Sequence, residues 1–127
     1  MDLADAVAVL ARTPGALDGM LRGLPDAWGR TSTGPGVWSP FDIVGHLISG
    51  ERTDWIPRAR IILEHGEARA FDPFDREGMF ETSKGKLLDR LLEEFAEARG
   101  ASLEALAGLP VEEHWDKRGL HPDLEGD

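Results

Sequence analysis

The chain lacks cysteine entirely over its 127 residues. This absence excludes a disulfide framework, a catalytic thiolate and a metal site with thiolate ligands. Long hydrophobic runs are absent too, since no stretch approaches the roughly 18 apolar residues of a membrane-spanning helix. The N-terminal segment carries acidic residues, Asp2 and Asp5, where a signal peptide would carry basic ones. Together these absences predict a cytoplasmic protein without a membrane segment.

Positive charge is in short supply. Lysine and arginine number 14 against 24 aspartate and glutamate residues, which gives a formal net charge of −10. Such a chain repels nucleic-acid backbones and anionic membranes, so we expect no nucleic-acid partner and no membrane partner. Apolar residues make up 41% of the sequence, which is enough for a folded core. At this length the sequence predicts a single domain over residues 1–127.

The first helix is predicted over residues 2–24. Apolar side chains recur there on one face of a helical wheel, at Leu3, Val7, Leu10, Leu17 and Leu21. Thr13 and Pro14 fall inside this stretch, where Thr13 could cap and Pro14 could open a second helix. The expectation is one helix with a break near residues 13–14, or two nearly collinear helices.

The second helix is predicted over residues 40–64. Ser39 is a suitable cap, Pro40 suits the first helical position, and Asp42 lies near the positive end of the helix dipole. An apolar stripe follows at Val44, Leu47, Ile48, Trp55, Ala59 and Ile62. Pro57 lies within this helix and is expected to kink it, because the periodicity resumes afterwards.

The third helix is predicted over residues 83–107. Its apolar face holds Leu87, Leu88, Leu91, Leu92, Phe95, Ser102 and Leu106. The long connection over residues 65–82 is expected to be irregular and to pack back onto the helices through its phenylalanines, and residues 108–127 form a polar tail. No stretch alternates with a period of two, so the fold class is all-α. The helices favour an antiparallel bundle, either closed with three helices or arranged for four-way packing.

Several motifs resemble those of DinB-like proteins, above all of their second helix. The run WSPFDIVGHL, from Trp38 to Leu47, carries the first part of this likeness. Further matching pieces stand at residues 51, 53–58, 61–63, 71–76 and 119–122. The similarity covers most of the chain from about residue 24 onward, and on these residues the chain resembles the DinB-like superfamily.

The resemblance implies an up-down-down-up four-helix bundle. Members of the family typically hold a divalent metal, often zinc or nickel, with three histidines. One of these comes from the second helix and two come from a histidine-x-x-x-histidine pair on the last helix. His46 matches the first ligand. The other two have no counterpart, because the sequence reaches Asp127 about where the last helix would begin. The expectation is a bundle truncated to three main helices, with an incomplete metal site.

Residue chemistry alone leaves the role of His46 open. The histidines of the chain are His46, His65, His114 and His121. No two of them lie three or four residues apart on a helix, as paired metal ligands often do. On an ideal wheel His46 points away from the apolar stripe and shares its side with Asp42, Ser49 and Thr53. This side is either a polar cleft where a fourth helix would lie or plain solvent-exposed surface. Of the others, one is expected at a helix end and two in the tail.

Two function hypotheses from different classes follow. The first is a DinB-like metal-dependent enzyme, such as a thiol-dependent transferase, with His46 as one ligand of zinc or nickel. The second is a non-catalytic helical module that forms a homodimer through the apolar groove left by an absent fourth helix. The four tryptophans of the chain are expected in core and loop packing rather than in a ligand cage.

Overall fold

The structure is a computed structural model that describes residues 2–72, 76–111, 113 and 119. Its α-helices, in chain order, are α1 (Leu3–Leu21), α2 (Asp26–Arg30), α3 (Pro40–Thr53), α4 (Trp55–His65), α5 (Arg76–Ser83) and α6 (Leu88–Ala107). A 3-10 helix, η1 (Gly66–Ala68), follows α4. The described residues form no β-strand, which confirms the all-α prediction. None of their helices combines the length and the apolar character needed to cross a membrane.

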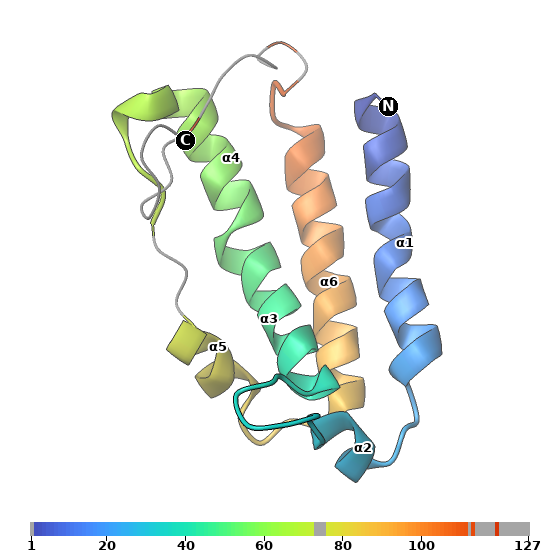
Figure 1. The fold of residues 1–127 in the computed structure, drawn as a ribbon. Helices are drawn as coiled ribbons and strands as arrows, with labels where there is room; N and C mark the ends of the chain where they lie inside the picture. The colour runs from blue at the N-terminus through green and yellow to red at the C-terminus, as the bar shows by residue number, and fades with distance from the viewer. Residues whose placement is uncertain (1, 73–75, 112, 114–118, 120–127) are drawn as a thin grey trace.

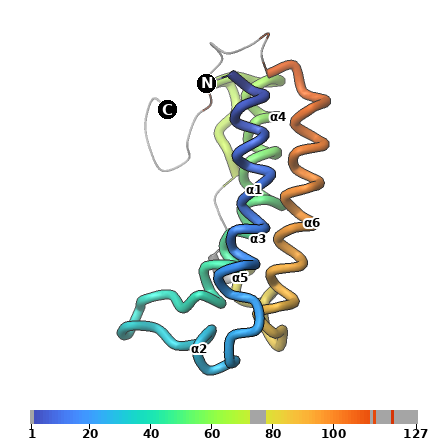
Figure 2. Tube along the Cα trace, turned by 90° about the vertical axis from the view of Figure 1, so that its right-hand side faces the viewer, coloured from blue at the N-terminus to red at the C-terminus, as the bar shows by residue number. Residues whose placement is uncertain are grey.

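The bundle is built from α1, the consecutive helices α3 and α4, and α6. The α3–α4 pair and α6 run in the same direction, and α1 runs in the opposite one (Figure 1). The view turned by 90° places α1 and α3–α4 on the same side of α6 (Figure 2). Because the most extensive helix contacts are those of α6 with α3 and with α1, α6 is the shared element. The directions match the first three helices of the expected up-down-down-up order.

Two helices begin at the caps that the sequence provides. At α1, the Asp2 side chain accepts a hydrogen bond from the Asp5 N–H, and the Asp5 side chain accepts one from the Asp2 N–H. At α3, Ser39 Oγ accepts from the Asp42 N–H at 3.2 Å, and Asp42 Oδ2 accepts from the Ser39 N–H at 3.1 Å. Each reciprocal pair satisfies backbone donors that a helix start leaves free. The predicted start of the second helix at Pro40 is therefore confirmed.

The expected break near residues 13–14 is wrong, because α1 continues through Pro14 to Leu21. Proline lacks the N–H that would bind the carbonyl of Leu10, four residues earlier. Arg99 of α6 supplies a replacement donor, since its Nη1 donates to the Leu10 carbonyl oxygen at 2.9 Å. This contact between helices compensates for the lost bond within α1, and the helix is not interrupted.

The second predicted helix is divided at Asp54 rather than kinked at Pro57. α3 ends at Thr53 and α4 begins at Trp55. Pro57 has no N–H to offer the Thr53 carbonyl, and its ring crowds that carbonyl, so the distortion falls one turn before the proline. The interruption also turns Trp55 out of the expected apolar stripe, and this residue is 60% exposed.

The third helix begins at Leu88 rather than at residue 83. α5 ends at Ser83, and Gly85 follows with a positive φ of 78°, a conformation that favours glycine. The turn separates α5 from α6 and leaves Leu87, expected on the apolar face, 63% exposed. The connection predicted as irregular thus contains η1 and α5, and α2 lies between the first two predicted helices.

The core lies between α3 and α6. Its buried members are Phe41, Val44, Ile48, Leu88, Leu91, Leu92 and Phe95. Leu17 and Leu21 of α1 pack against this cluster and are partly buried, as is Leu47 of α3. No residue of α1 is itself fully buried. α1 therefore covers one side of the core with half-buried side chains and keeps its remaining surface exposed.

Candidate functional site

His46, the metal ligand implied by the family resemblance, lies half-buried on α3. Its ring lies against Trp38 from the preceding loop, with ring centroids 4.9 Å apart and planes inclined by 50°. Trp38 in turn makes an edge-on contact with Phe80 of α5, with centroids 6.3 Å apart. These aromatic contacts flank one side of the imidazole and place α5 beside it.

Gly45 lets α5 approach α3 closely beside His46. A Cβ atom at this position would lie 2.5 Å from Ser83 Oγ, which is closer than such atoms pack. Ser83 is 5% exposed and Met79, one turn earlier on α5, is 1% exposed. The connection therefore packs back onto the bundle, through α5. Close packing explains the glycine of the glycine-histidine-leucine motif.

The described residues do not by themselves fit a metal centre. Within them, no three histidine, aspartate or glutamate side chains gather closely enough to hold a metal ion. His65 ends α4, where its Nε2 lies 3.8 Å from an oxygen of Glu64. His114 and His121 lie outside the described residues. His46 is thus a single candidate ligand, and no set of three ligands gathers in the described part of the chain.

Two motif pieces that are far apart in the sequence meet beside α4. Gly119 is buried, and a Cβ atom there would overlap the ring of Phe71 and approach Ile62. The guanidinium of Arg58 lies 5.0 Å from the centroid of the Phe71 ring. Arg58 also pairs with Asp54 at the α3–α4 division, with Nε and Oδ1 2.5 Å apart. These contacts anchor the segment after η1 to α4.

The expectation of packed tryptophans holds for Trp38 alone among the described ones. Trp28 of α2 is 68% exposed and Trp55 at the start of α4 is 60% exposed. Trp115 lies outside the described residues.

A buried ion pair joins α3 and α6. Glu51 is 5% exposed and Arg99 is 9% exposed, and Arg99 Nη2 donates to Glu51 Oε1 at 2.8 Å. Glu51 follows His46 by five residues, which places it about 140° further around the helix. The pair therefore occupies a different face of α3 from the histidine.

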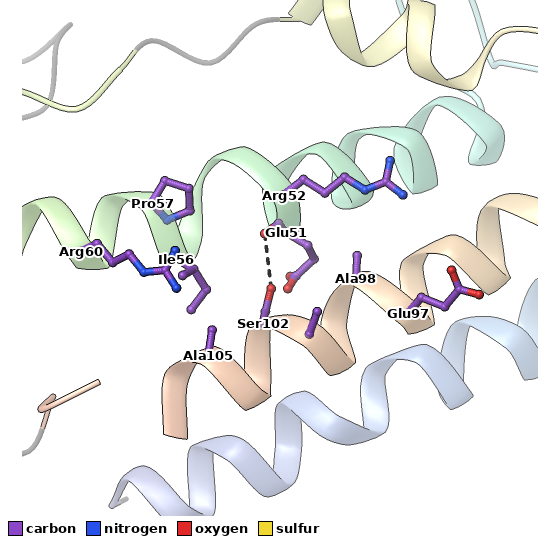
Figure 3. Close-up of a pocket in the computed structure, with 10 residues that line it drawn as sticks. Glu51, Arg52, Ile56, Pro57, Arg60, Glu97, Ala98, Ser102 and Ala105 are labelled. Carbon is purple, nitrogen blue, oxygen red and sulfur yellow. Dashed lines mark hydrogen bonds between the residues drawn. The ribbon is translucent and has the colours of Figure 1, made fainter. Parts of the chain in front are cut away.

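Arg99 also holds the three long helices together. Besides Glu51 of α3, it binds the Leu10 carbonyl of α1, and its guanidinium lies 5.1 Å from the centroid of the Phe95 ring. One turn further along α6, Ser102 Oγ donates to the Glu51 carbonyl at 3.3 Å (Figure 3). Polar side chains of α6 thus reach carbonyls of both neighbouring helices.

Two hollows flank this ion pair. The first, which we name the Arg99 cavity, has a volume of about 380 Å³ and lies between α1, α4 and α6. Glu51, Arg99 and Ser102 provide its polar lining, and its apolar walls are Leu10, Trp55, Ile56, Ala59, Leu103 and Leu106. The second, the α4–α6 groove, has a volume of about 400 Å³. Arg52 and Arg60 edge it on one side, and alanines of α6 line the other (Figure 3).

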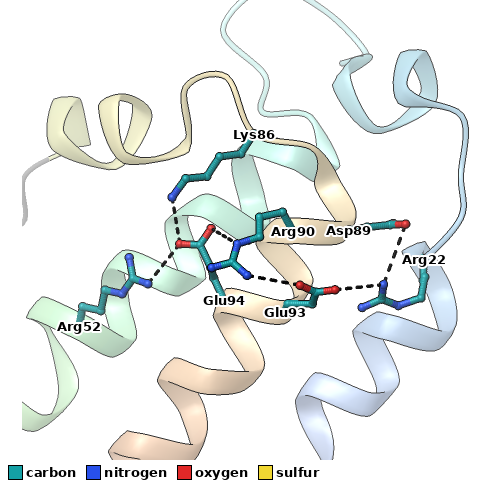
Figure 4. Close-up of polar contacts among 7 residues, drawn as sticks. All are labelled: Arg22, Arg52, Lys86, Asp89, Arg90, Glu93 and Glu94. Atoms are coloured by element: carbon teal, nitrogen blue, oxygen red, sulfur yellow. Dashed lines mark hydrogen bonds and ion pairs between the residues drawn. The ribbon is translucent and has the colours of Figure 1, made fainter.

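Glu94 of α6 is a second buried carboxylate, surrounded by three cations (Figure 4). Lys86 Nζ lies 3.0 Å and Arg52 Nη2 3.3 Å from its Oε1, and Arg90 Nε lies 3.6 Å from its Oε2. Burial tends to raise the pKa of Glu94. The hydrogen bonds and charges of Lys86 and Arg52 outweigh this effect, so the pKa is lowered from its ordinary value of 4.5.

Replacing Glu94 with glutamine is expected to make the free energy of unfolding less dependent on pH in the acidic range. The folded-state pKa lies below the unfolded-state value, so the ionised carboxylate contributes fully above pH 4.5. This contribution is lost as the pH falls through the folded-state pKa. The variant should therefore be less stable than the wild type near pH 7, and the difference should shrink as the pH is lowered below 4.5. Urea unfolding at neutral and at acidic pH measures it.

Glu93→Gln is the matched control for this experiment, because Glu93 is the neighbouring carboxylate and its side chain is 51% exposed. It pairs with Arg90 and Arg22 at the surface (Figure 4) and should change stability little at either pH. A difference between wild type and Glu94→Gln that stays constant with pH contradicts the assignment.

Sequence reasoning gave no role to Arg99 or Glu94. A signal was available, because Arg99 follows Phe95 by four residues and Glu94 follows Leu91 by three. Both therefore lie on the apolar face of the helix, where burying a charged side chain is costly unless it has a partner of opposite charge. The partners could not be named from the sequence, because they come from other helices.

The chain is similar to known proteins in its sequence family and in its fold. A family model described as the DinB superfamily matches residues 10–127. Among solved structures, the chain is similar to one described as "YfiT from Bacillus subtilis is a probable metal-dependent hydrolase with an unusual four-helix bundle topology". The two share 23% sequence identity with a TM-score of 0.77, over 94% of this chain and 68% of that one. At this identity the likeness establishes the fold. A search of curated proteins gives no match.

Proposed function

The chain belongs to the DinB superfamily, and on this premise we propose that it supplies His46 to a divalent-metal centre of a metal-dependent enzyme. The observation that carries the proposal is the placement of His46. The half-buried imidazole belongs to the family motif. The ring of Trp38 contacts one side of it. Next to it in the chain, Gly45 lies in close contact with Ser83 of α5. Zinc or nickel is the expected metal, and no three candidate ligands gather among the described residues.

The reaction class rests on relatives rather than on geometry. The family resemblance favours thiol-dependent group transfer, and YfiT, described as a probable metal-dependent hydrolase, offers hydrolysis as the alternative. The described residues do not by themselves complete a metal centre.

Metal titration tests this proposal. Zinc and nickel binding is measured by calorimetry and by elemental analysis after dialysis, for the wild type, His46→Ala and His65→Ala. Loss of a direct ligand should weaken binding by more than the roughly 10–100-fold that a supporting group contributes. His65→Ala should bind as the wild type does. Absence of binding, or equal binding by His46→Ala, overturns the proposal.

A second candidate function, self-association as a non-catalytic module, is favoured by exposed apolar side chains at the mouth of the Arg99 cavity. Leu10 is 37% and Trp55 60% exposed there. A second copy packed over this face would cover both side chains. Light scattering should then report a dimer at micromolar concentration, weakened by Trp55→Lys. A stable monomer contradicts this candidate.

A further inference from the structure

The Arg99 cavity combines apolar walls with a charged floor, and it is separate from the His46 face. Its volume of about 380 Å³ falls within the range of roughly 300–1,000 Å³ typical of small-molecule pockets. Leu10, Leu103 and Leu106 provide an apolar enclosure from two helices, and the exposed Trp55 stands at its edge. Pockets of this make-up bind molecules whose bulk is apolar and whose orientation is fixed by few polar groups.

The polar lining of the cavity, made by Glu51, Arg99 and Ser102, determines what kind of polar group would fit. Arg99 has five N–H donors, and the contacts with Glu51 and Leu10 use two of its nitrogens. Glu51 offers acceptor oxygens beside it, and the Ser102 hydroxyl lies one turn away on α6. The Glu51–Arg99 pair therefore presents a donor and an acceptor side by side.

The charge balance of this floor disfavours charged ligands. The carboxylate of Glu51 and the guanidinium of Arg99 neutralise each other at 2.8 Å. A charged ligand would lose its hydration beside a pair that carries no net charge to compensate it. A carboxamide accepts one hydrogen bond through its oxygen and donates through its nitrogen without adding charge.

We propose that the Arg99 cavity binds a small uncharged molecule with an apolar body and a carboxamide-like head that contacts the Glu51–Arg99 pair. This site is independent of the metal centre proposed at His46, because it uses a different face of α3. Neither proposal requires the other.

The test uses hydrocinnamamide as the probe and its charged analogue hydrocinnamate for comparison. Both are titrated into the full chain while tryptophan indole signals are followed by heteronuclear NMR, with Trp55→Phe identifying the signal of Trp55. Hydrocinnamamide should shift the Trp55 signal at millimolar concentration and leave that of Trp38, beside His46, in place. Hydrocinnamate should bind at least about tenfold more weakly, because its carboxylate would face Glu51.

Two alanine-to-leucine variants provide a matched control. Ala59 lines the Arg99 cavity and not the α4–α6 groove, and Ala105 lines the groove and not the cavity. Ala59→Leu should weaken hydrocinnamamide binding at least about tenfold by filling the cavity, and Ala105→Leu should change it less than about twofold. Thermal unfolding reports whether each variant folds. If Ala59→Leu does not fold, the wild-type titration decides by itself.

Several outcomes overturn the proposal. The Trp55 signal could stay fixed at millimolar hydrocinnamamide, or the Trp38 signal could move with it, which would indicate nonspecific binding. Equal affinity for the charged analogue would show that the floor does not select an uncharged head. Equal weakening by both leucine variants would place the ligand elsewhere. A dimer whose formation blocks the titration would assign this face to a second copy and not to a ligand.

Discussion

Replacing Arg99 with methionine is expected to lower the free energy of unfolding by about 3–5 kcal/mol. The substitution leaves the Glu51 carboxylate buried at 5% exposure without the guanidinium 2.8 Å away. It also removes the donor to the Leu10 carbonyl, which Pro14 leaves without a partner inside α1. Methionine fills a similar volume, so lost polar contacts rather than a cavity should dominate the effect. Urea unfolding followed by circular dichroism measures it.

The double variant Glu51→Gln with Arg99→Met separates charge from packing. With both charges removed, stability should recover by at least about 1 kcal/mol relative to Arg99→Met alone, because no carboxylate is left buried and unpaired. Two results would contradict the assignment. One is an Arg99→Met variant within about 0.5 kcal/mol of the wild type, as surface substitutions are. The other is a double variant that is less stable than the single one.

Replacing Phe95 with alanine is expected to be similarly damaging, at about 3–5 kcal/mol. Phe95 is 0% exposed in the α3–α6 core, and the guanidinium of Arg99 lies over its ring. Removing the ring leaves a cavity that the packed neighbours Leu91 and Leu92 fill only in part. Thermal and urea unfolding of the variant give the loss directly.

Leu87→Ala is the control for this substitution, because Leu87 precedes the same helix and is 63% exposed. Its loss should change stability by less than about 0.5 kcal/mol. Sequence periodicity alone would put Leu87 on the apolar face together with Phe95. If Leu87→Ala and Phe95→Ala lowered stability equally, Leu87 would lie on the apolar face, and the observed start of α6 would be contradicted.

Much of the fold could be predicted because it depends on local patterns. The cap at Ser39 and the apolar spacing of the long helices are properties of neighbouring residues. One error arose where a distant residue decides, because the continuation of α1 through Pro14 depends on Arg99, 85 positions later in the chain. Another was local, because the start of α6 depends on the turn at Gly85, which separates it from α5.

The same distinction applies to the candidate sites. His46 could be named as a candidate ligand because it stands in a contiguous motif, and the family resemblance behind that motif is confirmed by the match to the DinB superfamily. The Glu51–Arg99 pair and the cations around Glu94 could not be predicted, since their partners lie on different helices. Their only sequence signal is a charged residue on an apolar helix face.

Polar side chains of α6 bind backbone carbonyls that lie close to the prolines of the neighbouring helices. Pro14 leaves the Leu10 carbonyl without its usual donor, and Pro57 accompanies the division of the second helix at Asp54. Arg99 satisfies the first of these carbonyls, and Ser102 binds the Glu51 carbonyl just before the division. Polar side chains of α6 thus bind a carbonyl one turn before the proline of α1 and a carbonyl just before the α3–α4 division, beside the Arg99 cavity.

The central claim is that His46 is a metal ligand. It is tested most directly by anomalous diffraction at the zinc absorption edge from crystals of the zinc-loaded protein. We predict an anomalous peak about 2.0–2.1 Å from a ring nitrogen of His46, the usual zinc–imidazole distance. Zinc bound elsewhere in the crystal with no peak beside His46 would contradict the claim.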